Sequence, residues 1–309
     1  MNEAVLPLLH RLWIYQAERL PLAKTALLTL AFSSSSVTAS AAMAGRPLPG
    51  PAPYAVAFLL AFVTMLELRV LDEFKDREID RLHRPERPVP RGLVSLRLLA
   101  GIGIGGAALA LAAAVALAPG MVWPVLGCGL FMAAMTVHFG VPGLMHRSLL
   151  LTLGSHMLVM PVMDLMVTAC EWLPRGEPPP GALWIFLALS FANGCVLEIG
   201  RKTWAPGNER PHVESYSSAW GIHRAALAWL VVLVLAAGLL CALASVQGAP
   251  LVAVLAALCA IPTARVGVRF LADPTPARQK ALDTASGLWI LASYLVAGYG
   301  AYLSHRIIS

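Results

Sequence analysis

The chain has 309 residues, of which 58% are hydrophobic and only 13% charged, and its mean hydropathy is +0.71. This composition predicts an integral membrane protein and excludes an ordinary soluble enzyme. The net charge of +6 would suit a nucleic-acid binder, but the apolar bulk of the chain argues against nucleic acid as a partner. At roughly 20 residues per membrane-spanning helix, the length allows about eight to ten helices in one domain.

Residues 1–23 mix apolar side chains such as Trp13 with charged ones such as Arg11 and Glu18. This mixture favours an amphipathic helix lying in the membrane interface. A secretory signal peptide is the alternative, because residues 42–44 (Ala-Met-Ala) resemble a cleavage site, but the charged leader is too long for it. We therefore expect an interfacial helix over residues 1–23 and a single transmembrane domain over residues 24–309.

Nine apolar segments follow, and Gly, Pro or charged residues separate most of them. They cover approximately residues 24–43, 52–71, 95–118, 121–140, 147–169, 182–200, 222–246, 249–271 and 283–304. With a cytoplasmic N-terminus, all but three of the 23 Lys and Arg residues (the exceptions are Arg46, Arg175 and Arg306) lie on the cytoplasmic side, as the positive-inside rule requires. We expect an all-α protein with nine transmembrane helices around a central cavity and with its charged loops, 72–94 and 201–221, in the cytoplasm.

The first charged loop holds a regular series of carboxylates within residues 72–92. Asp72, Asp76 and Asp80 are spaced i, i+4 and i+8, and Glu73 lies three residues before Asp76, so one helix would place all four on one face. Like charges on one face repel, and a divalent cation would offset them. An all-oxygen site suits Mg²⁺, which binds one or two carboxylates together with water and substrate phosphates. The alternative is a solvated acidic helix end that is balanced by basic neighbours.

The residues that follow, 84–92, contain three prolines and therefore cannot be helical. We expect an ordered loop that presents Arg84, Arg87 and Arg91. Arginine grips phosphate oxygens in a bidentate fashion, so this loop predicts a phosphate-binding arm. For Arg91 the alternative is a positive-inside anchor before the next helix.

Residues 72–92 resemble the first aspartate-rich motif of the UbiA superfamily of intramembrane prenyltransferases. That motif reads Asn-Asp-x-x-Asp-x-x-x-Asp and is followed by a basic, proline-rich stretch that ends in glycine. Asp76 and Asp80 match its second and third aspartates, whereas Asp72 stands at the asparagine and Glu73 at the first aspartate. The nine-span layout extends the resemblance over nearly the whole chain.

The second motif of that family is another aspartate-rich segment after the sixth helix, and here the chain departs from it. Glu198 stands at the first acidic position, but Lys202 replaces the acid four residues later, and Glu209 and Glu214 follow further on. Glu198 would complete a metal site while Arg201 and Lys202 bind the diphosphate directly, which argues against a two-metal arrangement. The alternative is an ordinary i, i+4 ion pair between Glu198 and Lys202.

Two further residues are candidates for the acceptor side of the site. Asp164 lies deep in the fifth apolar segment, where a carboxylate normally faces the bundle interior. It could orient an acceptor hydroxyl, act as a base, or be protonated and bonded to a neighbouring helix. His156 lies eight residues earlier, close to the same face. Asn193 could reach the cavity or bond another helix, and Tyr216 could line the second loop.

The resemblance implies transfer of a prenyl group from an isoprenoid diphosphate to a small acceptor, aromatic or otherwise, through an allylic carbocation. The implied Mg²⁺ ligands are Asp72, Glu73, Asp76, Asp80 and Glu198. The implied diphosphate-binding residues are Arg84, Arg87, Arg201, Lys202 and Tyr216, and the implied catalytic residues are Asp72, Asp76, Asp80, Lys202 and Asp164. We expect a multi-pass protein of the bacterial inner membrane whose active-site loops face the cytoplasm.

Two other functions stay open at this stage. The same ionisation could be followed by cyclisation of the cation, as in an intramembrane terpene cyclase. A secondary transporter could use the acidic loops to bind a coupling ion, but it would place that site near the bilayer midplane between broken helices. The carboxylates of this chain lie at the membrane surface instead, which favours the enzyme.

Overall fold

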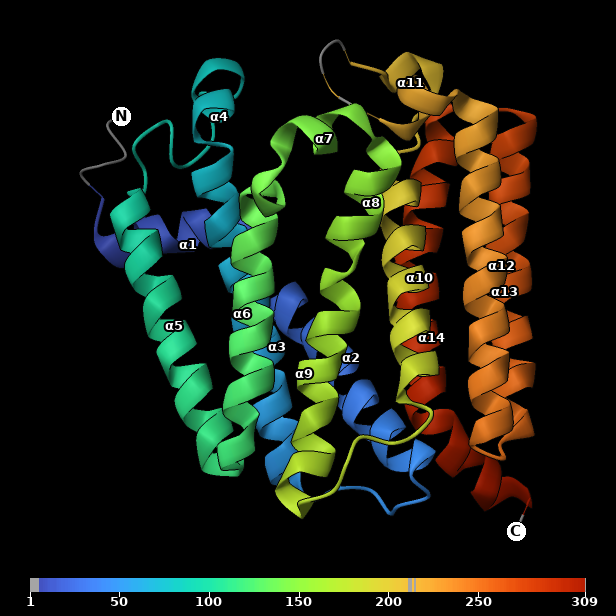
Figure 1. Ribbon diagram of the computed structural model, residues 1–309. Coiled ribbons are helices and arrows are strands. Elements are labelled where there is room, and N and C mark those ends of the chain that lie inside the picture. The colour runs from blue at the N-terminus through green and yellow to red at the C-terminus, as the bar shows by residue number, and fades with distance from the viewer. Residues whose placement is uncertain (1–5, 211–212, 214, 309) are drawn as a thin grey trace.

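The computed structural model describes residues 6–210, 213 and 215–308. Within these residues the fold is entirely helical and contains no strand (Figure 1). The same residues include nine helical segments that are long and apolar enough to cross a membrane. The all-α, nine-span architecture predicted from the sequence is therefore confirmed.

The nine spanning segments follow the predicted apolar segments closely. They are α2 (Leu22–Met43), α3 (Pro51–Lys75), α5 (Leu96–Leu117), α6 (Val122–Thr136, preceded by the 3-10 turn Pro119–Met121), the pair α8 (Leu149–Met157) and α9 (Val159–Trp172), α10 (Leu183–Arg201), α12 (Ile222–Val246), α13 (Pro250–Ala272) and α14 (Pro276–Ile308). One boundary differs: α14 begins seven residues before the apolar segment at 283, because a polar first stretch extends the helix beyond its apolar part. Prolines open α3, α13 and α14, where a fixed φ favours the first helical turn.

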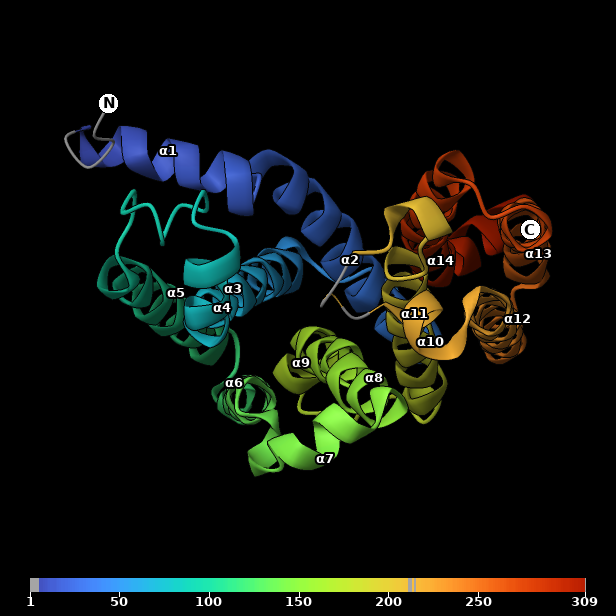
Figure 2. The same ribbon diagram turned by 90° about the horizontal axis from the view of Figure 1, so that it is seen from above.

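Four short helices complete the described part of the chain: α1 (Leu8–Arg19), α4 (Arg77–His83), α7 (Pro142–Arg147) and α11 (Tyr216–Trp220). α4 and α11 lie at the same end of the bundle, which we call the charged end (Figure 1). α1 runs crosswise to the long helices at the edge of the bundle, as Figure 2 shows. One side of α1 packs through Tyr15 against Leu93 and Val94, whereas Leu9 and Trp13 stay exposed.

The long helices form two groups, each with its own apolar core. In the first, α3, α5, α6 and α9 pack around Leu60, Met121 and Met163. In the second, α10, α12, α13 and α14 pack around Phe186 and Trp229. α2 lies between the groups and packs on α3, α9 and α14 (Figure 2).

The close approach of α2 and α14 depends on Gly298. A Cβ atom at this position would lie 2.6 Å from the Ser35 carbonyl oxygen of α2. Backbone cannot yield as a flexible side chain can, so the helices must separate if any side chain is added.

Gly298→Ala should therefore lower the free energy of unfolding by about 1–3 kcal/mol, because overpacking forces α2 and α14 apart. Gly287→Ala on the same helix is the matched control, since its Cβ would have no neighbour within 4 Å. Thermal unfolding of the detergent-purified variants measures both effects. Equal melting temperatures for the two variants would contradict this account of the α2–α14 contact.

Candidate active site at the charged end of the bundle

The two predicted charged loops both lie at the charged end (Figure 1). The first consists of α4 and the proline-rich arm, residues 84–92, which follow α3. The second follows α10 and includes α11 (Figure 1). Both loops therefore face the same end of the bundle, as the sequence requires for a shared site.

The carboxylates of the first loop do not share one continuous helical face. α3 ends at Lys75, α4 begins at Arg77, and Asp76 lies at the junction with φ −89° and ψ 3°. The helix is interrupted there, although the Asp76 amide still donates to the Asp72 carbonyl at 2.9 Å and the Asp80 amide to the Asp76 carbonyl at 2.8 Å. The carboxylates fall instead into a buried pair, Glu73 and Asp80, and a more exposed pair, Asp72 and Asp76.

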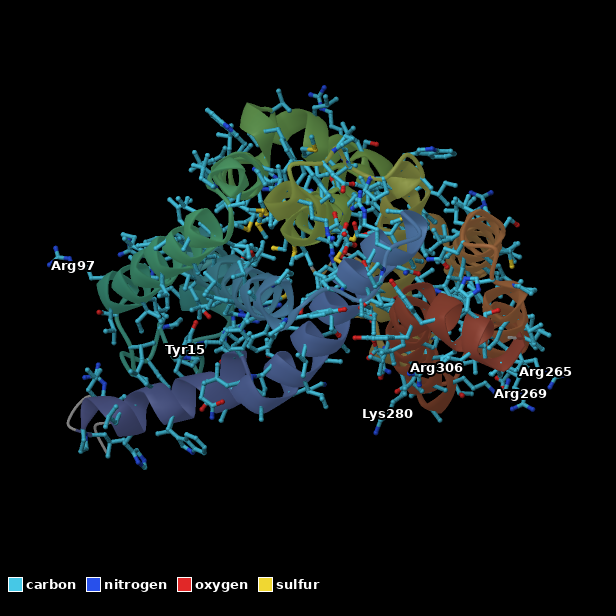
Figure 3. The ribbon with its side chains drawn as sticks, turned by 90° about the horizontal axis from the view of Figure 1, so that it is seen from below. Tyr15, Arg97, Arg265, Arg269, Lys280 and Arg306 are labelled. Atoms are coloured by element: carbon cyan, nitrogen blue, oxygen red, sulfur yellow. The ribbon has the colours of Figure 1, made fainter. Side chains whose placement is uncertain are left out.

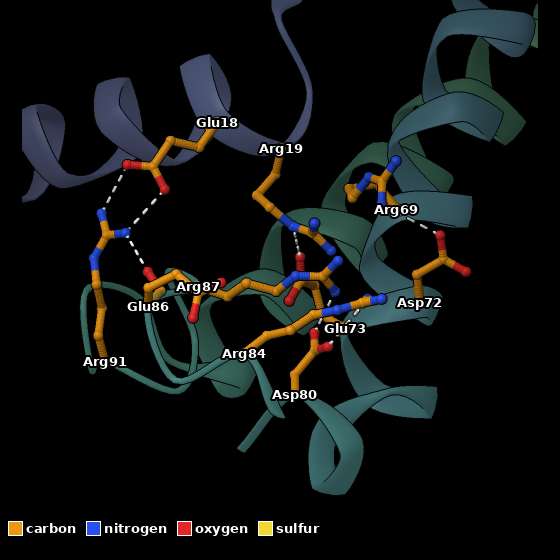
Figure 4. Close-up of polar contacts among 10 residues, drawn as sticks. All are labelled: Glu18, Arg19, Arg69, Asp72, Glu73, Asp80, Arg84, Glu86, Arg87 and Arg91. Carbon is orange, nitrogen blue, oxygen red and sulfur yellow. Dashed lines mark hydrogen bonds and ion pairs between the residues drawn. The ribbon is translucent and has the colours of Figure 1, made fainter. Parts of the chain in front are cut away.

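Arginines neutralise the buried pair, as Figure 4 shows. The Glu73 side chain is only 1% exposed, and its Oε1 accepts a hydrogen bond of 2.6 Å from Nε of Arg19 in α1. Asp80 Oδ2 accepts a 2.6 Å bond from Nη1 of Arg87, while Arg84 lies 3.7 Å from Asp80 Oδ1. A buried carboxylate requires such a partner, since an unpaired charge is costly to desolvate. The arm is thus folded back onto the acids that precede it.

Arg91 points in a different direction from the other two arginines of the arm. Its two terminal nitrogens donate to the Glu18 carboxylate of α1 at 2.9 and 2.8 Å, and Nη1 also donates to the Glu86 carbonyl. The hydrogen bond from Arg91 is the main reason that the pKa of Glu18 lies below its ordinary value. Arg91 therefore fastens the arm to α1, and its predicted phosphate contact stays a prediction.

The exposed pair keeps its carboxylates largely free. The Asp72 side chain is 52% exposed and pairs with Arg69 at 3.4 Å, and the Asp76 side chain forms no hydrogen bond or ion pair with the described residues. The two are four residues apart and interact electrostatically. Two free carboxylates fit Mg²⁺, which takes its other ligands from water and substrate phosphate. No group of three or more His, Cys, Asp or Glu residues suited to a metal occurs in the part of the chain that the structure describes.

The second loop contains a compact cationic cluster around Glu198. Lys202 Nζ lies 2.7 Å and Arg201 Nη2 2.5 Å from its carboxylate oxygens. This is the i, i+4 ion pair that the spacing predicts, extended by a second cation. Because two cations share one acid, the cluster keeps a net positive charge at the end of α10.

Tyr216 supports this cluster from α11. Its backbone amide donates to the Lys202 carbonyl at 2.9 Å, and its buried ring contacts Trp220 in a tilted arrangement with centroids 4.7 Å apart. Burial, followed by the nearby Glu198 charge, raises the pKa of the Tyr216 hydroxyl, so the hydroxyl stays protonated. A protonated hydroxyl is a hydrogen-bond donor, and its contact with a diphosphate oxygen stays a prediction.

Glu209 has a structural position in the second loop. It accepts hydrogen bonds from the hydroxyls of Ser215, at 2.8 Å, and Ser217, at 2.6 Å. These bonds hold the loop against the start of α11. Glu214, the other late acid, lies outside the described residues.

His156 lies in the last turn of α8. Lys75, on the last turn of α3, and Glu198 both lie close enough to interact with it electrostatically. Its Nδ1 lies 2.9 Å from the Thr152 carbonyl, which fixes the ring and favours the tautomer with the proton on Nδ1. His138 lies beside it with ring centroids 5.7 Å apart, on a backbone with φ +51° that is strained for a residue other than glycine.

Asp164 and Asn193 bind neighbouring helices. Asp164 is fully buried, and its oxygens accept hydrogen bonds from Ser36 of α2, at 2.6 Å, and Tyr294 of α14, at 2.5 Å. Asn193 donates to Ser293 at 3.0 Å and accepts from Trp289 at 2.9 Å. For both residues the structure matches the alternative of helix–helix bonding.

Sequence reasoning missed three residues of this region. Arg19 lies 54 positions before its partner Glu73, a separation that leaves no local signal. Lys75 lies inside the charged run without a distinguishing spacing, and His138 falls in an apolar stretch without a motif. His138 lies beside His156 only in the folded bundle, because the two residues are 18 positions apart in the chain.

A helical membrane bundle with acidic and cationic loops at one end defines a class of intramembrane enzymes that act on anionic substrates. The chain belongs to the UbiA prenyltransferase family, whose model matches residues 32–290. The family predicted from residues 72–92 is therefore confirmed.

Solved structures of UbiA homologs share the fold. The apo structure of a homolog from Aeropyrum pernix K1 matches with a TM-score of 0.65 at 18% identity, over 89% of this chain and 98% of that one. A homolog from Archaeoglobus fulgidus bound to DMAPP and Mg²⁺ matches with a TM-score of 0.56 at 15% identity, over 92% and 98% of the two chains. Digeranylgeranylglyceryl phosphate synthase of Thermococcus sibiricus is 37% identical over 65 residues, which are 19% of this chain and 23% of that relative.

Removing the Arg19 guanidinium should destabilise the protein, because it leaves the buried Glu73 charge without a partner. Arg19→Met should lower the free energy of unfolding by about 3–5 kcal/mol. The double variant Arg19→Met/Glu73→Leu should recover most of this loss, since it removes both charges.

Thermal unfolding in detergent is the measurement, and Arg81→Met is the control because the Arg81–Glu78 pair is exposed on both sides. If the double variant is as unstable as Arg19→Met, the Arg19–Glu73 ion pair is not what stabilises the contact between α1 and α3.

Proposed function

We propose that this protein is a Mg²⁺-dependent enzyme that transfers a prenyl group from an isoprenoid diphosphate to a small acceptor. One observation carries the proposal beyond family membership: the exposed carboxylates of the first loop and the Lys202–Glu198–Arg201 cluster of the second lie at the same end of the bundle (Figure 1). The free carboxylates of the first loop and the cations of the second can then act on one diphosphate. The family and the DMAPP and Mg²⁺ bound to the Archaeoglobus homolog support this proposal.

Asp72 and Asp76 are the residues that would hold Mg²⁺. When bound, Mg²⁺ supplies positive charge that stabilises the departing diphosphate. We infer a single ion, because Glu73, Asp80 and Glu198 already have cationic partners. The resemblance implies that these three residues are metal ligands. We assign them instead the positioning of the arginine and lysine side chains.

Positively charged side chains would neutralise the remaining negative charge of the diphosphate. Lys202 and Arg201 can bind its oxygens while Glu198 keeps them in place. In the arm, Arg84 is better suited than Arg87, because its contact with Asp80 is long and its side chain is 39% exposed. Arg87 is held at 2.6 Å and orients the arm.

These charges allow the allylic C–O bond to break, with both electrons leaving on the diphosphate. The carbocation that remains is attacked by the acceptor, which then loses a proton. His156 is placed to accept this proton, since the Nδ1–H bond to Thr152 leaves Nε2 with a free electron pair. Asp164 has both oxygens engaged in hydrogen bonds, so we assign it a structural role.

Asp76→Asn should reduce Mg²⁺-dependent diphosphate release by about a hundredfold or more, because it removes one of two free carboxylates. The measurement uses purified protein, Mg²⁺ and labelled prenyl diphosphates of several lengths, with and without small aromatic acceptors. Asp283→Asn is the matched control, since Asp283 is exposed on α14 and its side chain forms no hydrogen bond or ion pair with the described residues. Wild-type rates in Asp76→Asn would refute the metal assignment.

A further inference from the structure

A strongly basic cavity lies at the charged end. Its volume is about 650 Å³, and α1, α4, the arm and the first turn of α5 form its wall. Four arginines line it: Arg11, Arg77, Arg81 and Arg97. No acidic residue is among the described residues of this wall.

The positive charge of this cavity is only partly offset by neighbouring groups. Arg11 is fixed by a 2.6 Å hydrogen bond from Nε to the Leu93 carbonyl, which does not neutralise its charge. Arg81 has an exposed carboxylate partner, Glu78, at 3.1 Å. Arg77 and Arg97 are exposed and make no hydrogen bond or ion pair with the described residues, so their charges are available to a ligand.

The arm separates this cavity from the candidate active site. Arg84 and Arg87 turn toward Asp80, whereas the backbone around Pro90 and Gly92 lines the cavity. Gly92 makes this course possible, because its φ of +81° is one that other residues rarely adopt. The side chains of Arg84 and Arg87 therefore face Asp80, and the backbone around Pro90 and Gly92 faces the cavity.

The surroundings of the cavity indicate where it lies in the membrane. On the neighbouring α1, Leu9 is 82% and Trp13 68% exposed, as expected for side chains that insert between lipids. Arg97 points outward from the first turn of α5, as Figure 3 shows. Cationic and apolar groups side by side at the end of a spanning bundle match the level of the lipid headgroups.

We propose that this cavity binds the phosphate headgroup of an anionic membrane lipid. Arginine pairs with phosphate oxygens through parallel hydrogen bonds, and the volume lies in the range of small-molecule sites. A lipid is favoured over free phosphate because its acyl chains can contact the exposed apolar side of α1. Such a lipid would fasten α1 to the arm and the start of α5. The proposal does not depend on the proposed enzymatic activity.

The test compares lipid binding to the full-length protein in neutral detergent, by native mass spectrometry and by titration. The probes are phosphatidylglycerol, phosphatidylcholine and inorganic phosphate. We expect phosphatidylglycerol to bind at least tenfold more tightly than either of the other two. Arg77→Gln/Arg97→Gln should weaken its binding at least tenfold, because each arginine contributes to attraction of an anionic headgroup.

Arg269→Gln/Lys280→Gln is the matched control, since both are exposed cations on α13 and α14 outside the cavity (Figure 3). Its phosphatidylglycerol affinity should stay within about twofold of wild type. Equal loss in the control would overturn the site, and inorganic phosphate binding as tightly as the lipid would overturn the lipid as its occupant. The comparison of the two lipids on wild-type protein needs no variant, so equal binding of both would overturn the proposal even if the variants fail to fold.

Discussion

The charged end depends on the pairing of buried carboxylates with arginines that come from other segments. Glu73 and Asp80 are buried, and Arg19 and Arg87 compensate their charges at 2.6 Å. The same two contacts bind α1 and the proline-rich arm to the end of α3. The side chains of Asp72 and Asp76, in contrast, have no strong partners among the described residues.

The opposite end of the bundle is arranged in a different way. There Glu171 of α9 is buried and accepts hydrogen bonds from Arg46 at 3.0 Å and from Ser40 of α2 at 3.0 Å, and Arg175 lies 3.1 Å away. These charges satisfy one another and join the α2–α3 connection to α9. Free acidic and basic groups gather instead at the charged end.

Much of the fold could be predicted from the sequence, because a spanning helix needs a long apolar segment and its ends carry proline, glycine or charge. The i, i+4 spacing of Glu198 and Lys202 also predicts their ion pair, since that contact is local. The orientation of the first-loop acids was not predictable, because it depends on the helix break at Asp76 and on Arg19, far away in the chain. Asp164 could be placed in the interior, but its donors lie more than 120 positions away.

The central claim is that arginine pairing leaves carboxylates for one metal ion only. The most direct measurement counts bound Mn²⁺, as a spectroscopic substitute for Mg²⁺, in the presence of a non-ionisable thiolodiphosphate analogue of the prenyl donor. Electron paramagnetic resonance titration gives the number of ions per chain without any turnover. The account predicts one Mn²⁺ per chain with no coupling between metal ions. Two ions per chain with a spin-coupled signal would contradict it.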